Sequence, residues 1–194
     1  MSKFKATFLK SCSALENLPD DAVPEVALLG RSNVGKSSLL NTLAGEHQLA
    51  QTSRTPGRTR LLNLFEINDG ILRLVDCPGY GYAKIAREQR IGWGELIEPY
   101  LEQRENLQFC VLLVDSMIVP QRLDLELHAW LRQHQRPTLL VATKCDRLSG
   151  NQRPQAIKRL REAFGEEPLP FSSTSALGRD ALRQRILNAA RAVS

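Results

Sequence analysis

The chain has few of the residues that mark exported, metal-binding or membrane proteins. Its 194 residues contain only four cysteines, Cys12, Cys77, Cys110 and Cys145, and no two of them form a C-x-x-C pair. The three histidines share no metal-ligand spacing with the cysteines, so we expect a reduced protein without zinc or disulfides. No apolar run approaches the roughly eighteen residues of a membrane span, and the first residues lack the apolar core of a signal peptide. We therefore expect a cytoplasmic protein with no membrane partner.

Aromatic residues are also scarce, at 6%, whereas the hydrophobic fraction of 42% and the charged fraction of 24% are ordinary for a globular protein. A chain of this length is expected to form one domain that buries about 70% of the surface exposed by its unfolded form. Arginine outnumbers lysine by 19 to 7, and the formal net charge is +5. This balance favours anionic partners, although a solvated basic surface is the alternative explanation.

The most informative segment is Gly30–Ser37, GRSNVGKS, which matches the phosphate-binding pattern G-x-x-x-x-G-K-[ST]. It follows the apolar run Val26–Leu29 and precedes leucines at helical spacing, so we expect a loop between a strand and a helix. Such a loop directs backbone N–H groups and the positive end of a helix dipole at a triphosphate. We expect Lys36 to reach the β- and γ-phosphates and the Ser37 hydroxyl to bind Mg²⁺.

Strands alternate with amphipathic helices along the rest of the chain. Apolar runs predict strands at 61–67, 71–76, 109–115, 138–143 and 169–172, and helical faces lie within 123–134, 157–164 and 182–190. The pattern predicts a three-layer α/β P-loop NTPase fold, with a mainly parallel six-stranded sheet, one antiparallel strand and helices on both faces. We read residues 1–21 as a short N-terminal extension with a candidate edge strand at 6–9, 22–194 as the domain, and 46–60 as a mobile loop.

Two strand ends carry further candidate site residues, because ligands of open α/β sheets bind where the strands end. The segment Asp76–Gly79 offers a carboxylate for Mg²⁺ and a glycine N–H for a γ-phosphate. In Thr143–Asp146, the carboxylate of Asp146 can accept two hydrogen bonds from guanine that adenine cannot donate, and the Lys144 stem can lie along the base. Backbone N–H groups of Phe171–Ser173 would then meet the guanine O6.

Taken in order, these motifs resemble the translation-factor-like GTPases and, within them, the EngB/YihA/YsxC family of bacterial GTP-binding proteins. The resemblance runs from about residue 5 to the end, and its most family-specific parts are Thr55–Thr59 and Gly79–Ala83. It implies a Mg²⁺-dependent protein that binds GTP and GDP and acts in assembly of the large ribosomal subunit. Proteins like it are also needed for normal cell division and septation.

The resemblance also assigns roles to individual residues. It gives Lys36, Thr59 and Gly79 catalytic roles and makes Thr59 a second Mg²⁺ ligand beside Ser37. The implied nucleotide site comprises Gly30, Arg31, Ser32, Asn33, Val34, Gly35, Lys36, Ser37, Ser38, Gly57, Arg58, Thr59, Arg60, Leu61, Asp76, Cys77, Pro78, Gly79, Thr143, Lys144, Cys145, Asp146, Phe171, Ser172 and Ser173.

Two positions depart from the wider GTPase pattern. Thr143 stands where most relatives carry asparagine, so guanine is still selected by Asp146 but with weaker affinity. The last motif is usually Ser-Ala, and Ser175-Ala176 is the alternative to Ser172-Ser173 if the final strand extends beyond 172.

Tyr80 occupies the position where Ras-like enzymes carry the glutamine that orients the attacking water. We therefore predict slow intrinsic hydrolysis, on the order of 10⁻⁴ to 10⁻³ s⁻¹, until a partner supplies the missing group. Asn33 suggests K⁺ as that group, since related GTPases with asparagine here resemble potassium-activated enzymes. The alternative is that Asn33 only hydrogen-bonds within the loop.

The arginines suggest a second binding surface. Basic residues in the loops around the nucleotide would form a patch that binds ribosomal RNA. The alternative is that they serve the nucleotide or are solvated. These residues are Arg31, Arg54, Arg58, Arg60, Lys84, Arg87 and Arg90. Those of the last helix spread around its axis and read as solvated: Arg179, Arg183, Arg185 and Arg191. Trp93 and Trp130 read as packing residues.

Two other functions remain open. One is a nucleotide kinase, which the guanine motif and the lack of an acceptor-site lid disfavour. The other is a guanine-nucleotide module that acts directly on a cell-division structure. We expect a monomer whose partners are guanine nucleotide and the large ribosomal subunit or its rRNA.

Overall fold

A computed structural model describes residues 4–46, 49–50, 61–81 and 86–191. The elements in chain order are β1 (Ala6–Cys12), η1 (Leu15–Asn17), β2 (Glu25–Gly30), α1 (Lys36–Ala44), β3 (Leu62–Ile67), β4 (Leu72–Asp76), α2 (Ala86–Gln103), β5 (Leu107–Asp115), α3 (Arg122–Gln133), β6 (Thr138–Thr143), η3 (Cys145–Arg147), α4 (Gln152–Phe164), β7 (Leu169–Pro170) and α5 (Arg179–Arg191). None of the helices described is long and apolar enough to cross a membrane.

In the described parts of the chain, seven strands form one sheet in the order β1-β3-β4-β2-β5-β6-β7. Strand β3 runs antiparallel to both of its neighbours, and the other four pairings are parallel. The predicted mainly parallel sheet with one antiparallel strand is therefore confirmed. It has seven strands rather than six because the candidate edge strand is β1, which pairs with β3. A domain boundary at residue 21 stays a prediction.

A tight hairpin turn joins β3 to β4. Asn68 and Asp69 have positive φ values of 49° and 63°, as both central residues of a type I′ turn require. Asparagine and aspartate tolerate this left-handed region better than other residues with a Cβ, which explains why this pair connects the two strands so tightly.

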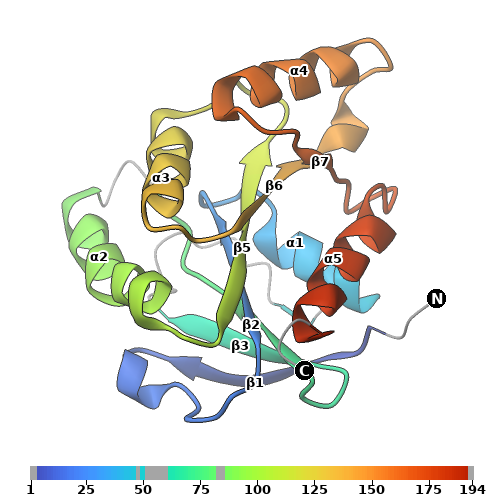
Figure 1. The fold of residues 1–194 in the computed structure, drawn as a ribbon. Helices are drawn as coiled ribbons and strands as arrows, with labels where there is room; N and C mark the ends of the chain where they lie inside the picture. The colour runs from blue at the N-terminus through green and yellow to red at the C-terminus, as the bar shows by residue number, and fades with distance from the viewer. Residues whose placement is uncertain (1–3, 47–48, 51–60, 82–85, 192–194) are drawn as a thin grey trace.

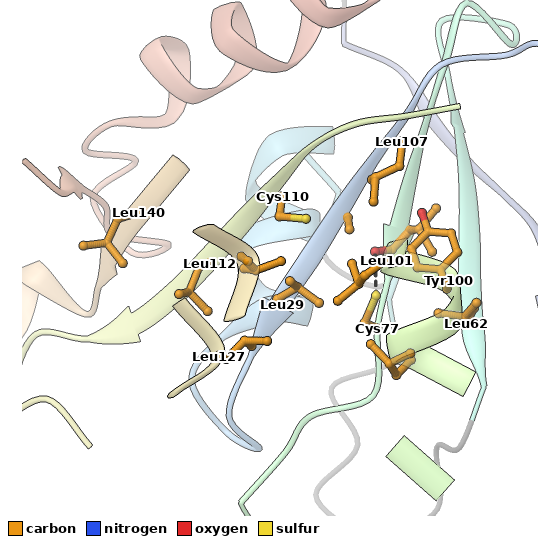
Figure 2. Packing of buried hydrophobic residues seen from close by; sticks show 14 of the residues in the cluster. Leu29, Leu62, Cys77, Tyr100, Leu101, Leu107, Cys110, Leu112, Leu127 and Leu140 are labelled. Carbon is orange, nitrogen blue, oxygen red and sulfur yellow. Dashed lines mark hydrogen bonds between the residues drawn. The ribbon is translucent and has the colours of Figure 1, made fainter. Parts of the chain in front are cut away.

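Helices cover both faces of the sheet, as Figure 1 shows, and each face has its own apolar core. One core packs apolar residues of α2, α3 and α4 against the sheet, and Figure 2 shows its centre, where Tyr100 and Leu101 of α2 lie near Cys77 and Leu62. The other core packs α1 and α5 against the opposite face. All four cysteines are free thiols and buried, so they behave as small hydrophobic residues.

Helix α2 is the largest element that the sequence analysis does not assign. It spans 18 residues and contains Pro99, and two glycines precede that proline within the helix. Proline and glycine both lower helix propensity, which hides the pattern. Tertiary burial outweighs that propensity, because Leu96, Ile97, Tyr100 and Leu101 are all buried in the core.

The carboxyl end of α2 is anchored to the start of β2 by a buried acid. The Glu25 carboxylate accepts hydrogen bonds from the Tyr100 hydroxyl at 3.1 Å and from Arg104 Nη2 at 2.7 Å. Arg104 Nη2 also donates to the Pro19 carbonyl at 2.8 Å. Arg104 therefore donates to both the Glu25 carboxylate and the Pro19 carbonyl. The buried charge of Glu25 thus has a fixed partner at the end of the sheet opposite the phosphate-binding loop.

Arg183 corrects one prediction for α5. Its side chain is only 16% exposed, and Nε donates to the Leu43 carbonyl at 2.8 Å, so it satisfies the last turn of α1 instead of lying in solvent. Its guanidinium also lies over the Phe4 ring, 5.6 Å from the centroid. Arg185 is exposed as predicted, and the side chain of Arg191 lies outside the described residues.

Trp130 packs against the core and stacks on His134, with ring centroids 3.9 Å apart, so the packing prediction is confirmed for this residue. The side chain of Trp93 lies outside the described residues.

Candidate functional site

The predicted phosphate-binding loop joins β2 to α1 as expected. Gly35, the residue before the helix, has φ +112°, and a Cβ there would meet no described heavy atom within 4 Å. The start of α1 has no side-chain cap among the described residues. Its first N–H groups therefore have no side-chain acceptor there, and the positive end of the helix dipole suits an anion.

Lys36 and Asp76 place two opposite charges beside this helix start. Lys36 Nζ donates to the Gly30 carbonyl at 3.2 Å, and burial lowers its pKa, against the effect of Asp76. Burial raises the pKa of Asp76 to about 6, and Lys36 opposes that change. Asp76 Oδ1 is buried and has no hydrogen-bond partner among the described residues. A carboxylate oxygen left without a donor, near Lys36 at the start of α1, fits a hydrated Mg²⁺ held against a polyphosphate.

The segment after Asp76 lies against the phosphate-binding loop. Ser32 N–H donates to the Tyr80 carbonyl at 3.0 Å, and Ser32 Oγ donates to the Gly79 carbonyl at 3.3 Å. A Cβ on Gly79 would lie 2.9 Å from both the N and the Cα of Ser32, so only glycine fits. The structure therefore brings Gly79 beside the loop, whereas the side chain of Cys77 turns into the core.

The Tyr80 side chain points to α3. Its hydroxyl donates to Asp124 Oδ1 at 2.7 Å, and Asp124 is only 4% exposed. Burial raises the pKa of both groups, and Tyr80 in turn lowers that of Asp124. Asp124 was missed by sequence reasoning, although it shares the i, i+3, i+4, i+7 spacing of the buried residues Leu127 and Leu131.

Arg31 lies close to Tyr80 rather than facing outward. Its Nε is buried and has no hydrogen-bond partner among the described residues. It also lies 3.2 Å from where a Cβ of Gly81 would be. Arg31 therefore does not belong to a fully exposed basic patch, whereas the other basic loop residues, or their side chains, lie outside the described residues.

Thr143 and Cys145 of the predicted guanine motif turn into the fold. Thr143 is buried, with Oγ1 2.9 Å from the Val34 carbonyl and 3.1 Å from the Val114 carbonyl. Cys145 is buried with Sγ 3.2 Å from the Ala142 carbonyl. Thr143 thus connects the end of β6 directly to the phosphate-binding loop.

Asp146 is exposed, and a hydrogen bond with Ser172 holds the pKa of its carboxyl below the usual range. Ser172 is buried, and its Oγ also accepts the N–H groups of Thr174 and Ser175 at 3.1 and 3.0 Å. The sequence analysis assigned only backbone roles here and missed this side chain. The hydroxyl therefore favours the ionised form of the Asp146 carboxyl, just beyond the end of β6.

Two of the three predicted N–H donors are already used within the fold. Phe171 N–H donates to the Ala142 carbonyl at 2.8 Å, and Ser172 N–H donates to the Leu177 carbonyl at 3.1 Å. Ser173 N–H is the remaining donor of that set. Strand β7 ends at Pro170, so the longer strand on which Ser175-Ala176 depended is not found.

The remaining predicted residues are placed unevenly. Asn33 is exposed with φ 65°, and Val34 is buried under the loop. Leu61 directly precedes β3. Gly57, Arg58, Thr59 and Arg60 lie outside the described residues.

Comparisons with known proteins agree with this geometry. A sequence family described as "50S ribosome-binding GTPase" matches residues 25–144. Proteins named "Probable GTP-binding protein EngB" from Pelotomaculum thermopropionicum and Solibacter usitatus are 47% and 46% identical over 185 and 178 residues. These matches cover 93% and 92% of this chain and equal shares of the two relatives.

Solved structures show the same fold. A crystal structure of a probable GTP-binding protein engB matches with a TM-score of 0.70 at 26% identity, covering 86% of this chain and 98% of that one. The FeoB G-domain from Methanococcus jannaschii matches with a TM-score of 0.58 at 25% identity, covering 87% and 97%. The chain therefore belongs to the EngB family of P-loop GTPases, which bind guanine nucleotide and hydrolyse GTP.

Proposed function

We propose that this protein is a slow, Mg²⁺-dependent GTPase switch that acts, as a cytoplasmic monomer, in assembly of the large ribosomal subunit. Normal cell division and septation would depend on it through the supply of ribosomes. The observation that carries this proposal is that residues 25–144, which contain the phosphate-binding loop, Asp76 and the start of the guanine motif, match a family described as 50S ribosome-binding.

The proposed nucleotide chemistry follows from the charges at the strand ends. Asp146 selects guanine, because its ionised carboxylate can accept two hydrogen bonds from that base. Lys36 and the start of α1 would bind the phosphates, and Ser37, Thr59 and Asp76 would hold Mg²⁺, which would neutralise phosphate charge. Gly79 offers its N–H to the γ-phosphate.

Slow hydrolysis is supported by the orientation of Tyr80. Its hydroxyl donates a hydrogen bond to Asp124 of α3. The side chain at the usual glutamine position therefore points to α3 and does not orient water. A partner or cation must then supply the catalytic group. Asn33, exposed in the loop, is the candidate K⁺ ligand, and GTPase rates in K⁺ and Na⁺ at equal ionic strength test this. Equal rates would exclude the potassium role.

Ribosomal RNA is the proposed partner, because the net charge is +5 and the loops around the site are rich in arginine. Binding through phosphates releases counterions, so recovery on ribosomal particles should fall steeply with salt.

Sedimentation with purified large subunits tests the ribosomal role. We expect more protein in the pellet with a non-hydrolysable GTP analogue than with GDP, and little for Lys36→Ala in either nucleotide. Equal recovery of the wild-type protein in both nucleotides would contradict a switch. No recovery at low salt would favour a module that acts directly on a division structure.

A further inference from the structure

Asp115, the last residue of β5, lies next to the guanine motif and uses both of its carboxylate oxygens. Oδ2 is 2.6 Å from Lys144 Nζ, and Oδ1 accepts the Met117 N–H at 2.9 Å. The side chains of Asp115 and Lys144 are only 17% and 26% exposed. A charge pair this short and this shielded holds both side chains in one geometry.

The loop that begins at Asp115 is itself fixed. Ser116 is buried, and its Oγ donates to the Thr143 carbonyl at 2.7 Å. From α4, Arg159 Nη2 donates to the carbonyls of Ser116 and Ile118, each at 3.1 Å. Asp115 is therefore held by a rigid support, so its carboxylate can position a partner instead of following it.

Lys144 needs such a support. Its backbone φ is +60°, in the left-handed region that residues with a Cβ rarely adopt, and it is the residue immediately before η3, which contains Asp146. The direction of the Lys144 side chain is thus tied to the turn that presents the guanine-selecting carboxylate. Without Asp115, its ammonium group would be free to swing into solvent or toward Asp146.

We propose that Asp115 is a positioning residue for guanine recognition: it holds the Lys144 side chain along the base and away from the Asp146 carboxylate. This inference rests on the proposed selection of guanine by Asp146. Asp115 lies on the base side of the site and has no part in the phosphate chemistry assigned to Lys36, Asp76 and Gly79. Its loss should therefore weaken nucleotide binding without slowing hydrolysis.

The Asp115→Asn variant tests the proposal, because asparagine keeps the shape and an oxygen for the Met117 N–H but removes the charge. We expect the Kd for GDP to rise about tenfold, as for loss of one charged hydrogen bond, and kcat for GTP to stay within about twofold. Asp69→Asn is the matched control. Asp69 also pairs with a lysine, but it lies on an exposed turn and its side chain is 80% exposed. It should leave both quantities unchanged.

A double-mutant cycle shows whether Asp115 acts through Lys144. In a Lys144→Ala background, Asp115→Asn should change the Kd for GDP by less than about twofold. Thermal unfolding of each variant confirms that it folds, and Asp115→Ala, which also removes the oxygen for Met117, provides a second test. Unchanged GDP affinity in folded Asp115→Asn, or a loss of full size in the Lys144→Ala background, would overturn the proposal. Equal affinity of the wild-type protein for GDP and ADP would instead refute guanine selection.

Discussion

The buried carboxyl of Asp76 gives a stability prediction with a definite sign. Its pKa is about 6, against an ordinary value of 3.8, because burial disfavours the charged form more than Lys36 favours it. Replacement by asparagine gives a neutral side chain of nearly the same shape at every pH. We predict that nucleotide-free Asp76→Asn is more stable than the wild-type protein at neutral pH.

The size of the effect follows from the two pKa values. A carboxyl whose pKa is raised on folding binds its proton more tightly in the folded state, so wild-type stability falls as pH rises from about 4 to about 6. At about 1.36 kcal/mol for each pKa unit, the difference corresponds to about 3 kcal/mol at pH 7 and above. The stability gain of Asp76→Asn should appear across this window and then remain constant.

Urea unfolding of both proteins, without nucleotide and with EDTA, measures this difference between pH 4.5 and pH 8. Metal and nucleotide must be absent because either would stabilise the folded wild-type protein by binding to it. Asp69→Asn again serves as control, and its stability difference from the wild-type protein should not change with pH. A gain as large at pH 4.5 as at pH 8, or a less stable Asp76→Asn at pH 8, would refute the reasoning.

The same substitution should remove function while it adds stability. Because asparagine offers no negative charge to hydrated Mg²⁺, GTP turnover should fall by a factor of at least about 100. A variant that gains stability and keeps normal Mg²⁺-dependent turnover would show that Asp76 has no part in the metal site. The Asp76 carboxyl is thus expected to lower the stability of the folded protein and to be required for its activity.

Two further substitutions test how α1 is held. Arg183→Ala should lower the free energy of unfolding by about 1–3 kcal/mol, because it removes the donors to the Leu43 carbonyl, whereas Arg185→Ala on the exposed side should stay within about 0.5 kcal/mol. Asn41→Ala should cost about 2 kcal/mol, because the Asn41 amide pairs with both the N–H and the carbonyl of buried Ala50, at 2.7 and 3.1 Å. Urea unfolding measures these free energies. If Arg183→Ala or Asn41→Ala were as stable as the wild-type protein, the contacts described for that residue would be contradicted.

Much of the fold could be predicted because its signals are local. The apolar run of β2, the loop glycines and the turn at Asn68 each occupy a few adjacent residues. Helix α2 could not be predicted this way, since it is stabilised by burial of Tyr100 and its neighbours against a sheet that the sequence pattern does not reveal.

The candidate site divides along the same line. The motifs predicted which residues gather at the strand ends, but they could not predict which atoms are free. Ser172 acts through its hydroxyl and Thr143 faces a carbonyl of the phosphate-binding loop, and both facts depend on how distant strands align. The burial of Asp124 could not be predicted either, because its hydrogen-bond partner Tyr80 is 44 residues away in the sequence.

The clamp between Glu25 and Arg104 has a mechanical consequence for α2. The helix has 18 residues and is therefore about 27 Å long, at about 1.5 Å for each residue. With its far end tied down, the helix can pivot but cannot slide. A tilt of about 10° about that fixed end would move its first turn by about 5 Å and leave the opposite end of the sheet in place.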